Sequence, residues 1–140
     1  MTRFVLFAFF SSVVFLIPIA YANGKSQKFE IIKITEQDNG TIVHVGQGAV
    51  LELSLPVMPG TGYRWEILSN KADELEQMNE TQFIQDERST NKIGTCETQV
   101  YRFVARNVGL TELKLGYRRP WETNSTLLKV FQVTVHIEEQ

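Results

Sequence analysis

The sequence predicts an all-β domain, specifically an immunoglobulin-like antiparallel β-sandwich of about seven or eight strands. Three observations support this prediction: apolar and polar residues alternate in short segments rich in β-branched and aromatic residues, turn-forming residues separate these segments, and a helical repeat is almost absent. The 140 residues fit one such domain. Strands of this kind form sheets with one apolar and one polar face, and two such sheets enclose a core by packing their apolar faces together.

Seven segments carry the alternation: residues 29–34, 41–45, 50–55, 63–67, 99–105, 110–117 and 131–137. The Asn39-Gly40 pair between the first two predicts a tight hairpin. Trp65 falls on the apolar face of its segment and is expected in the core. Residues 69–94 are polar and charged, and there the sequence predicts only a short helical turn at residues 72–78 and a short strand near residues 82–84.

The first 22 residues are typical of a secretory signal peptide. Arg3 precedes an apolar run that ends at the small-x-small site Ala20-Tyr21-Ala22, with Pro18 just upstream. An uncleaved membrane anchor is the alternative, because the run approaches the roughly 20 residues of a spanning helix. Cleavage leaves residues 23–140 as the functional domain, without stable membrane insertion, exported to a secreted, periplasmic or endo-lysosomal location. In a eukaryotic host, the triplets beginning at Asn39, Asn79 and Asn124 are glycosylation acceptors.

Composition excludes several classes of function. With 14 basic and 16 acidic residues, the chain lacks the charge expected of a nucleic-acid-binding protein. Cys96 is alone and has no internal disulfide partner, and two histidines leave little material for a structural zinc site, so we expect no metal and no cofactor. Cys96 and either His44 or His136 lack the local signature of a catalytic cysteine, so the chain is not expected to be an enzyme. We expect a monomer, although an exposed Cys96 offers a route to a dimer.

Residues 58–62 form the first loop of interest. Pro59 fixes φ at the second position of a turn, and Gly60 accepts the positive φ that a type II turn requires at the third. Gly60 and Gly62 flank Thr61 and leave its backbone open to close approach by another protein. The loop is therefore expected to be stiff and narrow.

Two further loops follow. Pro120 lacks a donor for strand pairing and places Trp121 in a connection, beside Arg119. Trp121 is either an exposed binding hot spot or a side chain folded back over the end of the sandwich. The other loop contains Gly94 and Thr95 and is a polar stretch with no signature of its own.

The runs at residues 59–65 and 117–121 together resemble the chagasin family of cysteine-peptidase inhibitors. Members share an Asn-Pro-x-Thr-Gly motif followed by an aromatic strand, a central glycine-rich loop, and an Arg-Pro-Trp loop near the end of the domain. Two departures are visible: Met58 replaces the asparagine, and Gly94 is followed by Thr95, Cys96 and Glu97 instead of further glycines.

The resemblance implies a tight, reversible, non-covalent inhibitor of papain-like cysteine peptidases. Three loops at one end would enter the active-site cleft, with the Pro-x-Thr-Gly loop over the catalytic cysteine. The implied peptidase-binding residues are Pro59, Gly60, Thr61, Gly62, Gly94, Thr95, Arg119, Pro120 and Trp121. The alternative is a secreted immunoglobulin-like adhesion or carbohydrate-binding module in which Trp121 stacks on a sugar.

Overall fold

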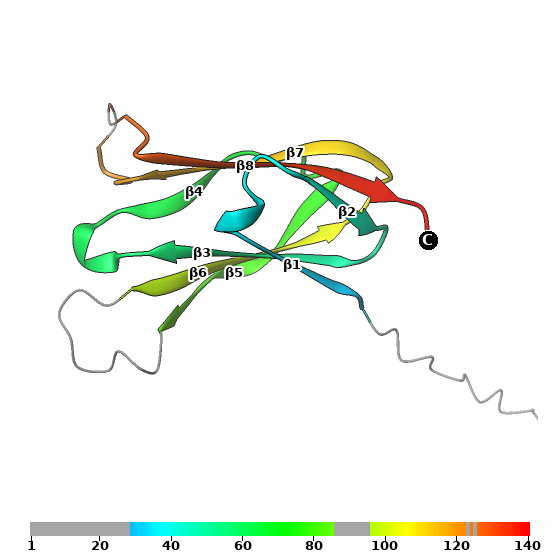
Figure 1. Ribbon diagram of the computed structural model, residues 1–140, viewed down its shortest axis with the longest axis horizontal. Helices are drawn as coiled ribbons and strands as arrows, with labels where there is room; N and C mark the ends of the chain where they lie inside the picture. The colour runs from blue at the N-terminus through cyan, green and yellow to red at the C-terminus, as the bar shows by residue number, and fades with distance from the viewer. Residues whose placement is uncertain (1–28, 86–95, 123, 125) are drawn as a thin grey trace, which may run out of the picture.

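The computed structural model describes residues 29–85, 96–122, 124 and 126–140 (Figure 1). The predicted signal peptide, Gly94 and Thr95 lie outside these ranges. The described part contains eight strands and two short 3-10 helices: β1 (Ile31–Thr35), η1 (Glu36–Asp38), β2 (Ile42–Gly46), β3 (Val50–Val57), η2 (Pro59–Thr61), β4 (Arg64–Ser69), β5 (Leu75–Gln85), β6 (Glu97–Ala105), β7 (Gly109–Arg118) and β8 (Lys129–Glu138). No helix within these ranges has the length and apolar character needed to cross a membrane.

The strands form two stacked four-stranded sheets, ordered β1-β3-β6-β5 and β2-β8-β7-β4 (Figure 1). The predicted all-β sandwich is therefore confirmed. Four strand pairs are antiparallel, whereas the edge strands β1 and β2 pair in parallel with β3 and β8, so both sheets are mixed.

The hairpin predicted at Asn39-Gly40 is wrong, because β1 and β2 belong to different sheets. The chain crosses between them through η1, where Asp38 accepts a hydrogen bond from the backbone N–H of Thr35. The amide of Asn39 then donates to the carbonyl of Val130 at 3.2 Å and accepts from the N–H of Gln132 at 2.8 Å. These side-chain bonds hold the crossing on β8, so the Asn-Gly pair serves a sheet-to-sheet connection.

The core lies between the sheets and follows the predicted alternation. Leu51, Leu53 and Leu55 are fully buried on the inner face of β3, and Trp65 is 2% exposed. Burial of such side chains contributes about 1.5–3 kcal/mol each to folding, before the entropy of ordering them is subtracted. With no disulfide between the described residues, the core and the strand pairing stabilise the domain.

The helical turn predicted at residues 72–78 is correct only at its start: the N–H of Leu75 donates to the carbonyl of Lys71 at 2.8 Å, but β5 begins at Leu75 and pairs with β6. The short strand predicted near residues 82–84 is confirmed as part of β5. Leu75 is fully buried, whereas most other side chains of this edge strand face solvent. The pairing register shifts between Met78 and Gln82, and Asn79 has φ 54. An exposed edge strand interrupted in this way lacks the period-two signal by which strands are recognised.

Strand register places several chain segments at one end of the sandwich. Here β3, β5 and β7 end while β4, β6 and β8 begin. Residues 58–63 and 118–122 therefore share this end, at the left of Figure 1. We refer to these two segments as the loop rim. The C-terminus lies at the opposite end.

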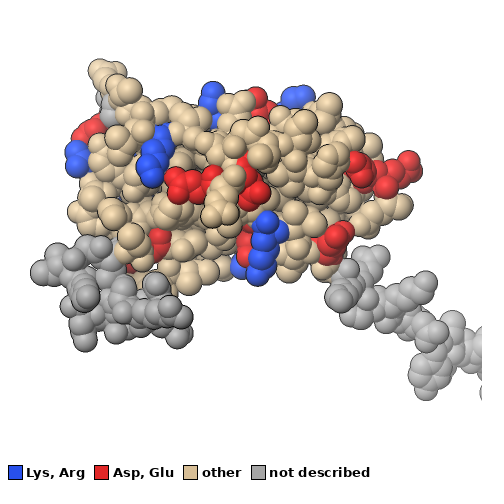
Figure 2. Space-filling model, viewed as in Figure 1, with Lys and Arg blue, Asp and Glu red and all other residues tan. Residues whose placement is uncertain are grey.

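The surface carries both signs of charge in close mixture. On the face shown in Figure 2, basic and acidic side chains are interspersed. Among the described residues, cross-strand ion pairs join Arg102 to Glu52 and Arg118 to Glu66.

Candidate functional site

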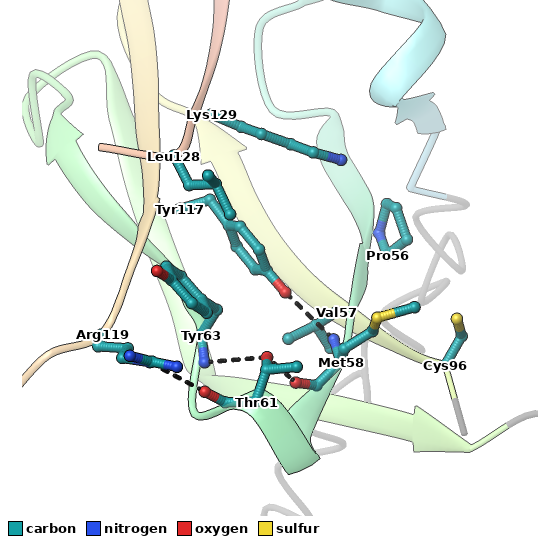
Figure 3. Close-up of a pocket in the computed structure, with 10 residues that line it drawn as sticks. All are labelled: Pro56, Val57, Met58, Thr61, Tyr63, Cys96, Tyr117, Arg119, Leu128 and Lys129. Atoms are coloured by element: carbon teal, nitrogen blue, oxygen red, sulfur yellow. Dashed lines mark hydrogen bonds between the residues drawn. The ribbon is translucent and has the colours of Figure 1, made fainter. Parts of the chain in front are cut away.

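The first segment of the loop rim is closed by its own hydrogen bonds. The N–H of Thr61 donates to the carbonyl of Met58 at 3.1 Å, and the N–H of Gly62 donates to that of Pro59 at 2.9 Å. The hydroxyl of Thr61 also donates to the Met58 carbonyl, at 2.6 Å, and accepts from the N–H of Tyr63 at 3.4 Å (Figure 3). Thr61 thus ties the start of the loop to its end.

The loop is a 3-10 turn and not the predicted type II turn. Gly60 does not have a positive φ, whereas Gly62 has φ 77 and ends the turn in the left-handed region. Pro59 stands at the start of the turn, where its fixed φ suits a helical conformation that Gly60 and Thr61 continue. The reversal of chain direction is therefore made at Gly62, the usual place for glycine at a helical C-terminus.

Trp121 lies directly against Gly62. A Cβ atom added to Gly62 would lie 2.2 Å from Cη2 of the indole, closer than any real contact. The tryptophan is nevertheless 63% exposed, so of the two predicted environments the exposed one is correct. The absence of a side chain at residue 62 allows the indole to lie on the backbone of the first segment.

Arg119 joins the two segments of the loop rim. Its Nε donates to the carbonyl of Thr61 at 3.0 Å, and its guanidinium carbon lies 4.7 Å from the ring centroid of Tyr63 (Figure 3). It also pairs with Glu122 at 3.2 Å. In the free protein, the contacts of Arg119 are those of a side chain that supports the loop.

Three aromatic side chains pack together beneath the loop rim. Tyr117 stacks on Tyr63 with ring centroids 5.4 Å apart and lies 5.0 Å from Trp65. Its hydroxyl accepts a hydrogen bond from the N–H of Met58 at 3.2 Å (Figure 3). Trp65 Nε1 donates to the carbonyl of Pro56 at 2.9 Å, which links the strands on either side of the loop.

Gln99 is a buried polar residue that sequence reasoning missed. Its amide accepts from the N–H of Trp65 at 2.9 Å and donates to the carbonyl of Trp65 and the hydroxyl of Tyr101, both at 2.8 Å. The Tyr101 hydroxyl donates to the same Trp65 carbonyl at 2.7 Å. Burial raises the pKa of Tyr101, so the hydroxyl stays protonated. Because β4 and β6 belong to different sheets, this network fixes the sheets together next to the rim.

Gln99→Leu should lower the free energy of unfolding by about 2–3 kcal/mol, because it leaves the buried N–H of Trp65 without a partner, whereas the Trp65 carbonyl keeps its hydrogen bond from Tyr101. Urea denaturation measures the change. Gln77→Leu, the same substitution at an exposed position of β5, is the control and should change stability by less than about 0.5 kcal/mol. Equal effects of the two substitutions would show that the Gln99 network contributes nothing.

A cleft of about 360 Å³ lies beside the rim, between Met58 and Tyr63 on one side and Leu128 and Lys129 on the other (Figure 3). The exposed, unpaired thiol of Cys96 also lines it. His44 and His136 lie on strands toward the opposite end of the sandwich. Within the described residues, therefore, no histidine is available to activate Cys96.

The structure brings seven of the nine predicted site residues together. Pro59, Gly60, Thr61 and Gly62 belong to the first segment. Arg119 and Trp121 contact it from the second segment, with Pro120 between them in the chain. Gly94 and Thr95 lie outside the described residues. The binding of a peptidase by all nine stays a prediction.

Comparison with known proteins identifies relatives in the family that the sequence motifs resemble. Residues 44–135 match the family model of the chagasin family peptidase inhibitor I42. Chagasin of Trypanosoma cruzi is 27% identical over 93 residues, which cover 64% of this chain and 82% of chagasin. Amoebiasin-2 of Entamoeba histolytica is 24% identical over 104 residues, covering 74% of this chain and 83% of the relative.

Solved structures agree on the fold. The crystal structure of the cysteine protease inhibitor EhICP2 from Entamoeba histolytica superimposes with a TM-score of 0.71 at 24% identity, covering 79% of this chain and 98% of that one. PbICP-C, solved in complex with falcipain-2, gives a TM-score of 0.52 at 14% identity and covers 79% and 99%. The family model spans most of the sandwich, including both segments of the loop rim, and the chain therefore belongs to the chagasin family of peptidase inhibitors.

Proposed function

We propose that this chain is a tight, reversible, non-covalent inhibitor of papain-like cysteine peptidases, and that the loop rim blocks the active-site cleft. Membership of the chagasin family supports inhibition as the function. It favours inhibition over the alternative of an adhesion or carbohydrate-binding module. The chain acts as a binding protein and not as an enzyme.

The observation that carries the proposal is the contact between Gly62 and Trp121. It makes one continuous surface from two segments far apart in the sequence. The narrow first segment projects beside an indole that is 63% exposed, and tryptophan is the residue type most enriched in binding hot spots.

Preorganisation explains how this surface would bind tightly and resist cleavage. The loop loses little conformational entropy on docking, because the hydrogen bonds of Thr61 and Arg119 already hold it. A backbone held in a 3-10 turn differs from the extended substrate strand on which a peptidase acts, so its carbonyl groups are held away from the geometry needed for attack.

Titration of a fixed amount of active papain with the purified chain tests the proposal. We expect activity to fall linearly to zero at one-to-one stoichiometry, with the inhibitor recovered intact by mass spectrometry after dissociation. Papain that keeps full activity at excess inhibitor would refute inhibition of this peptidase class and favour the adhesion module. Steady loss of the inhibitor by proteolysis would show that the loop is a substrate.

Met58→Asn should leave the inhibition constant unchanged or lower it by up to about fivefold. Met58 is the N-cap residue of η2, and its side chain makes no capping hydrogen bond. Asparagine caps such turns well, with a gain of about 1 kcal/mol in favourable cases, and would stiffen the loop. Inhibition assays with papain measure the change. A large loss of affinity would show instead that the half-exposed methionine itself contacts the peptidase.

Export of the chain is a second part of the proposal, and it rests on the sequence of residues 1–22. Expression with a secretory host and mass spectrometry of the secreted product provide the test. The proposal expects a mature chain that begins at Asn23. A membrane-bound product that retains its first residues would support the alternative of an uncleaved anchor.

A further inference from the structure

Both histidines of the chain lie side by side on the outer face of one sheet. His44 on β2 is the register neighbour of His136 on β8, and the ring centroids are 5.2 Å apart. Glu138 follows His136 by two residues and so projects from the same face of β8. The sequence offered no means of pairing these residues, because the strands that carry them are about 90 residues apart in the chain.

The three side chains converge on one point. Oε1 of Glu138 lies 2.7 Å from Nδ1 of His44 and 3.3 Å from Nδ1 of His136. All three ligand-type atoms lie within 4.8 Å of one another.

We propose that His44, His136 and Glu138 form a binding site for a divalent transition-metal ion, with Zn²⁺ as the best-matched ion. Two imidazoles and one carboxylate are donors that Zn²⁺ accepts in a tetrahedral arrangement. The fourth position stays open to water. This inference revises the expectation from composition that the chain holds no metal.

Side-chain movements of about an ångström allow the three residues to accept the ion. Ligand atoms about 2.1 Å from a tetrahedral Zn²⁺ are separated from one another by about 3.4 Å. The 3.3 Å separation from Glu138 to His136 is already close to this value, and the 2.7 Å separation to His44 must open by about 0.7 Å. The ligand atoms of the two histidines lie within 4.8 Å of each other, so they must approach by at most about 1.4 Å. The side chains are 40–62% exposed, so they can move by this amount and the ion has free access from solvent.

A metal at this position would join two strands of one sheet. β2 is an edge strand, and within its sheet it pairs with β8, in parallel. An ion held by side chains of both strands binds the folded state and not the separated strands, so it should raise the thermal stability of the domain. The site lies toward the end of the sandwich opposite to the loop rim, so inhibition should not depend on it.

Isothermal titration of Zn²⁺ into the purified chain tests the proposal. The protein should carry no polyhistidine tag and should contain Cys96→Ser, so that neither a tag nor the free thiol competes for the ion. We expect saturable one-to-one binding and a higher melting temperature with Zn²⁺ than with Mg²⁺. His44→Ala and His136→Ala should each weaken binding by about tenfold or more and remove the thermal shift.

Glu138→Gln and Glu139→Gln make a matched pair, because Glu139 is an exposed carboxylate outside the cluster. The first should weaken Zn²⁺ binding and the second should not. Unchanged inhibition of papain by each variant shows that it is folded. Absence of saturable binding to the parent protein, or equal binding by the parent and both histidine variants, would overturn the proposal.

Discussion

Gly62→Ala should raise the inhibition constant for papain by on the order of 100-fold. The φ of 77 at this residue costs a side-chain-bearing residue about 1–2 kcal/mol, and the new methyl group would also occupy the position of the Trp121 ring. Either the 3-10 turn or the indole must move. Displacement of a hot-spot tryptophan adds about 2 kcal/mol, which together with the backbone strain corresponds to roughly two orders of magnitude in affinity.

Two further variants isolate the cause. Gly60→Ala adds the same methyl group where φ is not positive and where no atom lies within 4 Å, so its thermal stability should match the parent. The double variant Gly62→Ala with Trp121→Ala removes the clash, and its loss of affinity should be smaller than the sum of the two single losses. Strict additivity would contradict the account of a shared surface, as would a Gly62→Ala variant that inhibits normally.

Trp121→Ala should weaken inhibition by about 2 kcal/mol, or roughly 30-fold, without loss of folding. The tryptophan is 63% exposed and lies outside the core, so its removal leaves the packing between the sheets intact. We expect the unfolding midpoint in urea to stay close to that of the parent while the inhibition constant rises.

Val108→Ala is the matched control for this substitution. Val108 is an apolar residue, 53% exposed, in the turn between β6 and β7 at the end opposite to the rim. Its truncation should leave inhibition unchanged. Equal potency of the parent and Trp121→Ala would remove the indole from the binding surface, and equal losses in both variants would point to a general effect on folding.

The fold was predictable where burial imposes a period of two on the sequence. β3 and β8 bury alternate apolar side chains, and their segments were recognised from this pattern. The pairing partners of the strands were not predictable from the sequence. The local signal of Asn39-Gly40 is the same whether the chain turns back in a hairpin or crosses to the other sheet. In β5, exposure of the edge strand left only the short segment near residues 82–84 recognisable as a strand.

The site was predictable in composition more than in geometry. Pro59 and the glycines predicted a stiff loop. Which glycine takes the positive φ, Gly60 or Gly62, was not predictable, because it depends on the helical conformation that follows Pro59. The contact of Trp121 with Gly62 joins segments about 60 residues apart, so the local sequence around either residue gives no signal of it. Gln99 did leave a signal: it is a polar residue in the inward register shared by Tyr101, Phe103 and Ala105.

Hydrogen exchange of the chain, free and bound to active-site-blocked papain, tests the central claim most directly. The account predicts that the complex slows exchange at the backbone amides of residues 60–63 and 118–122, apart from Pro120, which has none. Amides in the turns at residues 46–48 and 106–109, at the far end, should exchange as in the free protein. Protection confined to the far end, or none at the loop rim in a formed complex, would contradict the claim that this rim enters the cleft.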